Sequence, residues 1–564
     1  MTVSSVESAT RAPVEPGGPE GHRAWSDLAG LLVILVVAAV LRLPGLTARG
    51  TWDADQGHDM LVLWRLFVDH QLPLLGPPTS IGDFHHGALY YYLLAPFAWL
   101  SGGNPTVVVG AIALGGIAAA GVTWWLARSM AGSVAGFVAG LLMAVSASSI
   151  LESTFIWNPN IVALFSAIAL SGAWQAHRTG QARWWVVAAV GLLVTMQAHV
   201  LGIALAPPLL VAYVLDLRQR PPGEARRRIV RAGLAAIVIV LLGYLPLFVH
   251  ELSSGFSETQ AALAFLEAGG QPVALALPSR LLFVGLRIVA WPVAGLLTDH
   301  LVVGVVAGVA IVTGLIWRVL SAAQPERYGA RFLGMTLFFG WLVLGAGIGS
   351  MATVTALPVD HYHAYLDPIV FVAAGLTVAG LWQATSAKLQ GTGFVAPSAN
   401  ARRAVRAVAV LAVVGLLGYN LAIAPAAVAL DGGWPAAEAA STRILGSTGS
   451  RPIELRSLPA FKAPDAYGYP LIMAGAAVTG TLDTPTAWSR AAASAGDRTG
   501  AVVGDVPAAA LAAPGAIVVV CDRLFVATCG GAPESAAVPA SGFRLVDRFS
   551  AAPGRTISVY LAGP

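Results

Sequence analysis

The sequence predicts an α-helical polytopic membrane protein with about 11 transmembrane helices, followed by a small C-terminal α/β domain. Of its 564 residues, 56% are hydrophobic and only 11% are charged, and the mean hydropathy is +0.72. A soluble domain carries about 25% charged residues, so this composition excludes an ordinary soluble globule. The two cysteines exclude a disulfide-rich scaffold and a Cys-based zinc module. After about residue 430, Gly, Pro and polar residues shorten the apolar runs, which indicates a second domain.

The N-terminal residues 1–24 are rich in Pro, Gly and Glu, so we expect a disordered cytoplasmic tail. The first apolar run, 28–43, is long for a signal-peptide core and is not followed by an A-x-A cleavage site, which indicates a retained anchor. Residues 25–430 are predicted to form the transmembrane domain. Its expected spans are 28–43, 106–127, 132–150, 160–176, 184–199, 201–215, 232–250, 300–317, 332–352, 364–384 and 407–425.

The placement of charged residues decides whether two further apolar stretches, 87–101 and 279–297, are counted as transmembrane spans. With both taken as interfacial or re-entrant and the N-terminus inside, the Arg clusters at 218–231 and 402–406 fall on the inner side. The short outer loops 151–159 and 353–363 then contain no Lys or Arg, which is the positive-inside pattern. The sequence therefore predicts a multi-pass protein of the plasma (inner) membrane, with a cytoplasmic N-terminus and an extracytoplasmic C-terminus.

The C-terminal segment 431–564 is predicted to be the extracytoplasmic α/β domain. Residues 516–520 and 556–560 have the composition of short strands, and the Ala-rich stretches 491–495 and 508–513 are typical of helices. Cys521 and Cys529 lie eight residues apart, and on an oxidising face we expect them to form a disulfide, with two free thiols as the alternative. The aromatic residues of Tyr467-Gly468-Tyr469-Pro470 could stack on sugars or belong to a core.

The first outer loop has the densest polar sequence of the chain, Trp52-Asp53-Ala54-Asp55-Gln56-Gly57-His58-Asp59. A helix that starts near Asp55 places Asp55 and Asp59 on one face, and its amphipathic continuation suits a helix at the membrane surface. Carboxylates there can act as general bases, as metal ligands or as partners of Arg. Glu152 lies in the next outer loop. The alternative is that these acids are solvated loop residues and that Glu152 caps a turn.

An irregular Pro-rich loop, 72–80, comes next, followed by Phe84-His85-His86-Gly87-Ala88-Leu89-Tyr90-Tyr91-Tyr92. The three tyrosines are typical of an interfacial aromatic belt. Two adjacent histidines are a weak metal-binding signal.

With an acidic motif outside the first span, a long amphipathic loop and then a His-Gly-Ala-Leu-Tyr-Tyr segment, the chain resembles the GT-C membrane glycosyltransferases over residues 25–385. The resemblance is to the protein-O-mannosyltransferase and aminoarabinose-transferase branch, glycosyltransferase family 39. The family commonly has Asp-Glu where this chain has Asp55-Gln56, and often two prolines where it has Gly87 and Ala88. A later Arg-Tyr-rich segment of the family corresponds to Asp360-His361-Tyr362-His363, with histidine in place of arginine.

The resemblance implies transfer of a sugar from a polyprenyl-phosphate donor to an acceptor hydroxyl on the outer face, with inversion at the anomeric carbon. Asp55 is the expected general base, with Asp53 as the other candidate. The acceptor is a cell-envelope glycan, lipid or protein of a bacterium, and no nucleic acid is involved. A divalent cation, helped by Asp53, Asp59 or Glu152, is a candidate cofactor. The expected donor-binding and acceptor-binding residues are Asp59, His58, Glu152, His86, Tyr90, Arg280, Arg287, His361, Tyr362 and His363. Arg280 and Arg287 are seven residues apart and share a helical face, so they could meet a lipid phosphate; the alternative is that they snorkel to the headgroups.

Two other classes stay open at this point. A transporter or flippase of a lipid-linked saccharide would also need many spans, but it usually carries ionisable groups near the membrane midplane. The predicted spans hold almost none, and Gln197 and His199 are the nearest candidates. A non-catalytic scaffold that presents the C-terminal domain would not need eleven spans.

Overall fold

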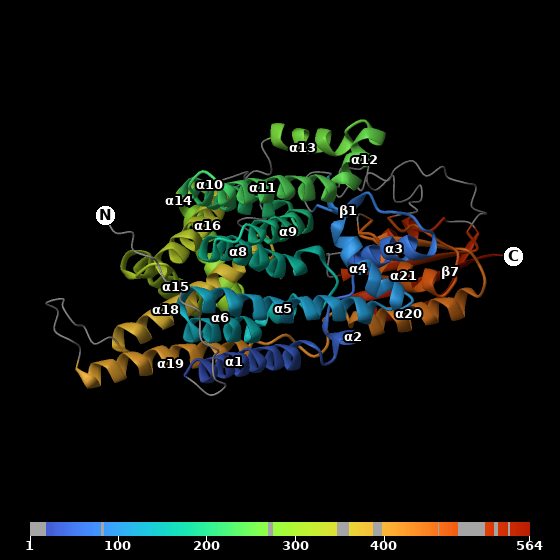
Figure 1. The fold of residues 1–564 in the computed structure, drawn as a ribbon. Coiled ribbons are helices and arrows are strands. Elements are labelled where there is room, and N and C mark those ends of the chain that lie inside the picture. Colours follow the sequence, from blue (N-terminus) through green and yellow to red (C-terminus); the bar gives the residue numbers. More distant parts are fainter. Residues whose placement is uncertain are drawn as a thin grey trace, which may run out of the picture.

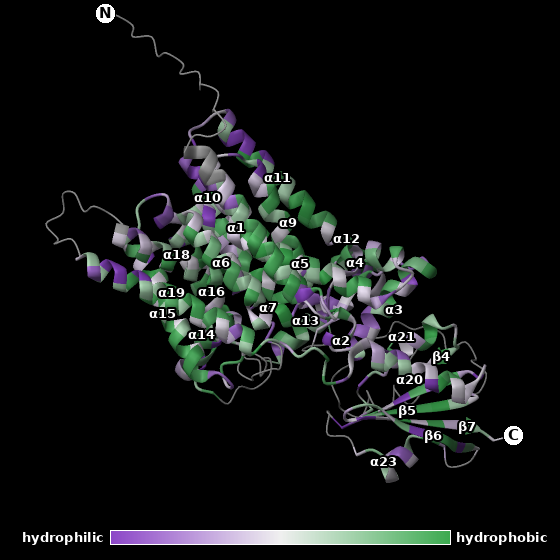
Figure 2. Cartoon of the chain, turned by 90° about the horizontal axis from the view of Figure 1, so that it is seen from below, coloured by the Kyte–Doolittle hydropathy of each residue, from purple (hydrophilic) through white to green (hydrophobic). Residues whose placement is uncertain are grey.

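The computed structural model shows a long helical bundle with a small α/β domain at one end (Figure 1). Figure 2 shows that the bundle is mainly hydrophobic and that hydrophilic residues collect near its ends and in the α/β domain. The structure describes residues 19–79, 84–268, 275–346, 360–386, 398–460, 462–482, 514–523, 528–539 and 542–563.

The first part of the bundle runs to residue 268. Its helices are α1 (Pro19–Arg42), α2 (Leu46–Arg49), α3 (Ala54–Val68), α4 (Leu89–Leu100), α5 (Pro105–Ala131), α6 (Ser133–Val145), α7 (Ala147–Leu151), η1 (Asn158–Ile161), α8 (Val162–Thr179), α9 (Arg183–Ala198), η2 (Val200–Leu205), α10 (Ala206–Gln219), α11 (Glu224–Gly243), α12 (Leu245–Ser254) and α13 (Ser257–Glu267). Helix α1 begins at Pro19, so the predicted disordered tail of 1–24 ends too late. Proline suits the first turn of a helix, where its missing N–H is not needed.

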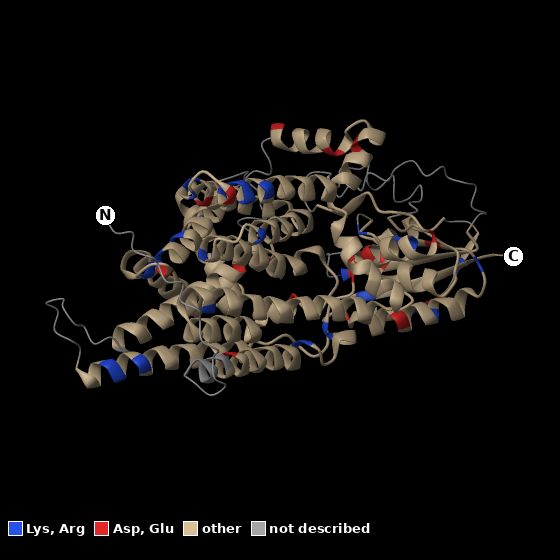
Figure 3. Cartoon of the chain, viewed as in Figure 1, with Lys and Arg blue, Asp and Glu red and all other residues tan. Residues whose placement is uncertain are grey.

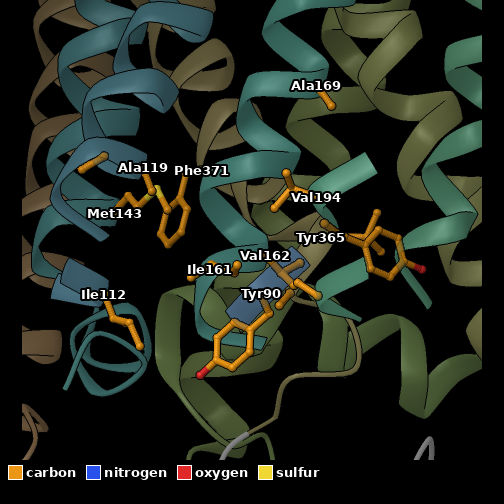
Figure 4. Packing of buried hydrophobic residues seen from close by; sticks show 14 of the residues in the cluster. Tyr90, Ile112, Ala119, Met143, Ile161, Val162, Ala169, Val194, Tyr365 and Phe371 are labelled. Carbon is orange, nitrogen blue, oxygen red and sulfur yellow. The ribbon is translucent and has the colours of Figure 1, made fainter. Parts of the chain in front are cut away.

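The second part of the bundle comprises α14 (Leu277–Ala294), α15 (Leu301–Ser321), α16 (Glu326–Ala346), η3 (Ala364–Leu366), α18 (Asp367–Ser386) and α19 (Ala399–Ala422). Helix α18 is almost entirely buried and packs on α5, α6 and α15. At Gly375, an added Cβ would lie 2.4 Å from the Ala135 carbonyl oxygen, so glycine permits the close approach of α18 to α6. Figure 4 shows part of this core, including Met143 of α6 and Phe371 of α18.

Eight helices of the described ranges are long and apolar enough to cross a membrane, or nine if the bent pair α11–α12 is one span. The predicted eleven spans differ from these nine by adding α6, α8 and α9 and by omitting α14. Stretch 279–297, predicted to be interfacial or re-entrant, instead forms the continuous 18-residue helix α14, which can cross by length and composition. Its arginines are accommodated by protein groups, since Arg280 binds a carbonyl and Arg287 a carboxylate. Helix α4 has only 12 residues, short of the roughly 20 needed.

The loop between α3 and α4 is more regular than the sequence predicts. Leu75–Pro78 (β1) pairs antiparallel with His85–Gly87 (β2). An added Cβ on Gly76 would lie 2.3 Å from the Gly87 carbonyl oxygen, so the pairing depends on a residue without a side chain. The predicted irregular loop 72–80 therefore contains a short strand, which fixes the backbone just before α4.

The C-terminal domain is a small α/β domain, as predicted. Its five-stranded sheet has the order β4-β3-β5-β7-β6, in which β3 runs parallel to β4 and β5, and β7 runs antiparallel to β5 and β6. Cys521 and Cys529 form the predicted disulfide. The two Ala-rich stretches fall outside the described residues. The elements are α20 (Gly433–Thr448), β3 (Ile453–Leu458), α21 (Asp465–Met473), β4 (Val478–Thr479), β5 (Ala516–Asp522), α23 (Gly531–Ala536), β6 (Phe543–Ala552) and β7 (Arg555–Ala562).

The C-terminal domain lies directly against the segment that connects α1 to α3 (Figure 1). The Trp52 ring lies 4.6 Å from the Trp434 ring and 6.1 Å from the Tyr469 ring. The Trp52 backbone N–H donates to the Asp431 carboxylate at 2.9 Å, and its indole N–H donates to the Ala466 carbonyl at 2.7 Å. Tyr467 and Tyr469 are buried, so of the two alternatives for these tyrosines the structure supports the core.

Candidate functional site

Helix α3 begins at Ala54, one residue before the predicted start, with Asp53 as its N-cap. Asp53 and Gln56 form a capping box, in which the Gln56 side chain accepts from the Asp53 backbone N–H at 2.9 Å. The Gln56 amide also donates to the Ile156 carbonyl at 2.9 Å. A carboxylate could not donate this bond, so the departure from the family pattern at Gln56 fits its surroundings.

Asp53 is committed to ion pairs with the C-terminal domain. Its carboxylate lies 2.5 Å from Lys462 Nζ and 2.7 Å from an Arg555 guanidinium nitrogen. Both cations also contact Asp522, at 3.1 Å and 2.8 Å. A carboxylate held by two cations is engaged in the contact between the two domains and is therefore less free to meet a ligand.

Asp55 is placed differently. Its side chain is exposed, and no hydrogen bond or ion pair within the described part of the chain holds it. Loss of hydration next to the protein, followed by the nearby Asp53 charge, raises the pKa of the Asp55 carboxyl, while His58 and Lys462 oppose the rise. An accessible carboxylate without a committed partner and with a raised pKa is suited to accept a proton near neutral pH.

Asp59 lies one turn further along α3 and Tyr90 lies on α4, and both side chains are buried rather than open to a ligand. The Asp59 carboxylate accepts hydrogen bonds from the Tyr90 hydroxyl at 3.0 Å and the Tyr91 hydroxyl at 2.8 Å, which joins α3 to α4. Burial raises the pKa of Asp59 to about 7, against the effect of His58 and the two tyrosines.

The raised pKa of Asp59 predicts a pH dependence of stability. Because the folded-state pKa of about 7 exceeds the ordinary carboxyl pKa of 3.8, the unfolded chain releases this proton first as the pH rises. The stabilisation is therefore complete below the unfolded pKa and is lost as the pH rises toward 7. Asp59→Asn, neutral at every pH, is expected to gain stability relative to wild type across this interval, measured by thermal unfolding. Parallel profiles of the two proteins would contradict the assignment.

His58 faces the C-terminal domain. Its Nδ1 lies 3.4 Å from the Asp465 carboxylate, which is fully buried at the start of α21. The second oxygen of Asp465 accepts from the Leu482 backbone N–H at 3.1 Å. Between Gln56 and His58, a Cβ on Gly57 would lie 2.2 Å from the Asp465 carbonyl carbon, so the backbones of α3 and α21 are in direct contact.

Gly57→Ala tests this contact. The added methyl group must push α21 away from α3, and overpacking of this kind costs about 1–3 kcal/mol. We expect a lower unfolding temperature and faster proteolytic release of the C-terminal domain. The control is Gly446→Ala in α20, where an added Cβ meets nothing within 4 Å. Equal effects of the two substitutions would show that the α3–α21 contact is not tight.

Glu152, Arg287, Asp360, His363 and Asp367 form a second group, here called the buried charge cluster. The Arg287 guanidinium forms a two-pronged pair with Asp360, with one contact at 2.7 Å. His363 Nε2 lies 3.3 Å from Asp360, and its Nδ1 lies 3.0 Å from Asp367. Glu152 accepts from the Trp291 indole N–H at 3.0 Å.

The pKa values of the residues in the buried charge cluster are shifted in different directions. Burial would raise the pKa of Asp360, but His363 and Arg287 outweigh it and lower the value to about 2. Burial would lower the pKa of His363, but Asp360 and Asp367 raise it to about 10. Burial and then Asp367 raise the pKa of Glu152 to about 8. Glu152 is therefore neutral at pH 7, whereas His363 is a cation that is already paired.

His86, His361 and Tyr362 meet His199 in a third group, here called the histidine cluster. The His199 ring lies 5.3 Å from both the His86 and His361 rings and 5.7 Å from the Tyr362 ring. Burial, then His199, holds the pKa of His86 well below its usual value. His86 is thus a neutral, buried imidazole, whose Nδ1 has no hydrogen-bond partner among the described atoms.

The structure separates the two arginines that the sequence placed on one helical face. Arg287 is buried against Asp360, whereas Arg280 is half-buried and its Nε donates to the Gly345 carbonyl at 2.5 Å. No carboxylate in the described ranges pairs with Arg280. Of the two, Arg280 is the guanidinium that remains available for a ligand phosphate.

The sequence did not assign roles to Lys462, Arg555, Asp465 or Asp367, which contact the predicted site residues Asp53, His58 and His363, or to Asp522, which pairs with Lys462 and Arg555. One signal was present, because Lys462 is one of only two lysines in the chain. Within the described ranges, no three or more His, Cys, Asp or Glu side chains gather closely enough to hold a metal ion. The divalent cation therefore stays a prediction.

The bundle and its C-terminal domain have the fold of the solved structures of ArnT and AglB, which confirms the predicted GT-C fold. ArnT from Cupriavidus metallidurans in the apo state matches with a TM-score of 0.58 and 16% identity, over 96% of this chain and 100% of that chain. The same protein bound to undecaprenyl phosphate matches with a TM-score of 0.57 and 16% identity, over 96% and 99%. AglB from Archaeoglobus fulgidus, in complex with an inhibitory peptide and a dolichol-phosphate, matches with a TM-score of 0.52 and 13% identity, over 93% and 73%. No family model and no curated protein matches the sequence.

Proposed function

We propose that this protein is a membrane glycosyltransferase that moves a sugar from a polyprenyl-phosphate donor to an acceptor hydroxyl at the outer face of the plasma membrane. The observation that carries the proposal is Asp55, an accessible and unpaired carboxylate at the start of α3, in a chain that matches ArnT over its full length. Acceptor candidates are a cell-envelope glycan, a lipid or a protein.

An apolar cavity supports the choice of a lipid-linked donor. Its volume is about 580 Å³, and it is lined by α14, α15 and α16 through residues such as Leu281, Val312 and Phe338. ArnT has been solved with undecaprenyl phosphate bound, and AglB with a dolichol-phosphate. In this proposal the polyprenyl chain enters the cavity, and its phosphate meets Arg280, which directly precedes the lining residue Leu281.

The proposed reaction is a direct displacement. The acceptor oxygen attacks the anomeric carbon while Asp55 takes the hydroxyl proton. The bond between the anomeric carbon and the phosphate oxygen breaks, and polyprenyl phosphate leaves with the electron pair. Attack opposite the leaving group inverts the anomeric carbon. Arg280 stabilises the charge that develops on the leaving phosphate.

Charge placement supports the orientation. Figure 3 shows Lys and Arg gathered at the ends of α10, α11 and α19 that lie away from the C-terminal domain. The residues concerned are Arg218, Arg220, Arg226, Arg227, Arg228, Arg231, Arg402, Arg403 and Arg406. Positive residues favour the cytoplasmic side, so we place the C-terminal domain and Asp55 outside.

The test is an assay of purified protein with several polyprenyl-phosphate sugars and candidate acceptors, read by mass spectrometry of the product. Transfer from at least one donor is expected. Movement of a lipid-linked saccharide across liposomes without transfer from any donor would overturn the proposal in favour of a transporter or flippase.

A further inference from the structure

The start of α21 in the C-terminal domain lies against the site. Asp465 lies there with its carboxylate fully buried, one oxygen bonded to the Leu482 N–H and the other 3.4 Å from His58 Nδ1. His58 follows Asp55 by three residues on α3, which puts both side chains on one face of the helix. Asp465 therefore lies beside an imidazole that acts electrostatically on Asp55, the proposed base.

The backbone makes this juxtaposition rigid. The direct contact of α3 and α21 at Gly57 leaves no space for a side chain, and the Trp52 indole holds the Ala466 carbonyl at 2.7 Å. On the other side of Asp55, Lys462 and Arg555 fix Asp53. The C-terminal domain thus contacts the start of α3 both before and after Asp55.

We propose that Asp465 is a positioning residue of the active site, which holds the His58 imidazole beside Asp55, so that the site is complete only when the C-terminal domain is docked. The proposal rests on the proposed function for its chemistry. A carboxylate next to an imidazole favours the imidazolium. A cationic His58 in turn favours the ionised form of Asp55, which is the form that accepts a proton.

Several charges face this pair. Asp53 and Asp59 lie on α3, Lys462 and Asp465 come from the C-terminal domain, and Tyr90 and Tyr91 come from α4. Among the effects on the pKa of Asp55, that of His58 precedes those of Lys462 and Asp465 in size and lowers it, whereas Asp465 itself raises it. Losing the imidazolium and losing the Asp465 charge therefore shift Asp55 in opposite directions.

Because the two effects shift the pKa of Asp55 in opposite directions, the direction of the shift in a variant shows which effect operates. Asp465→Asn keeps an oxygen for the Leu482 N–H but removes the charge that stabilises the imidazolium. We expect the acid limb of the pH profile of kcat/KM to move up by about one pH unit, with about a tenfold loss of transfer on the acid side. If Asp465 acted only through its own charge, the limb would move down, and that result overturns the proposal, as does an unchanged profile.

Two further measurements guard against a simple folding defect. His58→Asn is expected to shift the limb in the same direction, and the double variant no further than either single one, because the two residues act as a unit. Additive losses would contradict the proposal. The control is Asp547→Asn, since Asp547 pairs with Arg443 on the surface of the same domain. Its profile is expected to match that of wild type.

A readout without substrate separates this inference from the proposed function. Carbethoxylation of His58, followed by peptide mass spectrometry, reports the neutral imidazole. Asp465→Asn is expected to speed the reaction at pH 6, because an imidazole without its carboxylate has a lower pKa. Unchanged reactivity overturns the inference. If wild type transfers no sugar at all, the proposed function fails, while this measurement still decides the pairing.

Discussion

Asp55→Asn is expected to reduce sugar transfer by about 10²–10⁴-fold, the usual contribution of a general base. The amide matches the shape of the carboxylate but cannot accept the acceptor's proton. Because the Asp55 side chain is exposed and holds no partner among the described residues, the substitution breaks no contact, and the folded structure is expected to persist. Initial transfer rates of purified protein in detergent or nanodiscs measure the effect.

The matched control is Asp69→Asn, which removes an exposed carboxylate at the C-terminal end of the same helix. Its transfer rate and unfolding temperature are expected to equal those of wild type. A wild-type rate in the Asp55→Asn protein would remove Asp55 as the base. An equal loss in both variants would show that the charge of the loop matters rather than one carboxylate.

The sequence predicted the helix that carries Asp55 because local signals were strong. The residues that follow Asp55 continue as an amphipathic run, which predicts a helix, and the structure adds that Asp53 and Gln56 form the capping box at its start. The choice between Asp53 and Asp55 depended on partners instead. Lys462 lies 409 residues from Asp53 in the chain, and Arg555 lies still further away. No local sequence pattern could therefore show that these two cations pair with Asp53.

The tyrosines 90–92 show the same limit, because their contacts also come from residues that are distant in the sequence. The tyrosines 90–92 were read as a membrane belt, yet two of them bind the buried Asp59 carboxylate. Composition gives the polarity of a segment but does not show what packs against it. Cys521 and Cys529 were predictable because only two cysteines exist and they are close in sequence.

Helical periodicity put Arg280 and Arg287 on one face of α14 and implied one role for both. The seven-residue spacing is close to two helical turns, so the inference about the face is sound. The partners differ because Arg280 and Arg287 lie about two turns apart along α14, and different elements pack against the helix at the two positions. Arg287 reaches Asp360, just before α18, whereas Arg280 reaches Gly345 near the end of α16.

This difference predicts that Arg287→Met destabilises the fold while Arg280→Met weakens donor binding. Removing one partner of a buried ion pair costs about 3–5 kcal/mol, because the remaining charge is left uncompensated. Asp360 would keep only His363, so we expect a clearly lower unfolding temperature in detergent. Arg280→Met loses a single bond to a carbonyl, and we expect near-normal stability with a raised KM for the polyprenyl-phosphate donor.

A double variant decides whether the Arg287 effect comes from the unpaired charge. Asp360→Asn in the Arg287→Met background removes the isolated carboxylate, while His363 keeps Asp367 as its partner at 3.0 Å. Part of the lost stability is therefore expected to return, which gives a coupling energy for the pair. If Arg287 instead bound the donor phosphate, Arg287→Met would raise the donor KM and leave the unfolding temperature unchanged. The two arginines would then share the role that their common helical face first implied, and Asp360 would serve only to orient one of them.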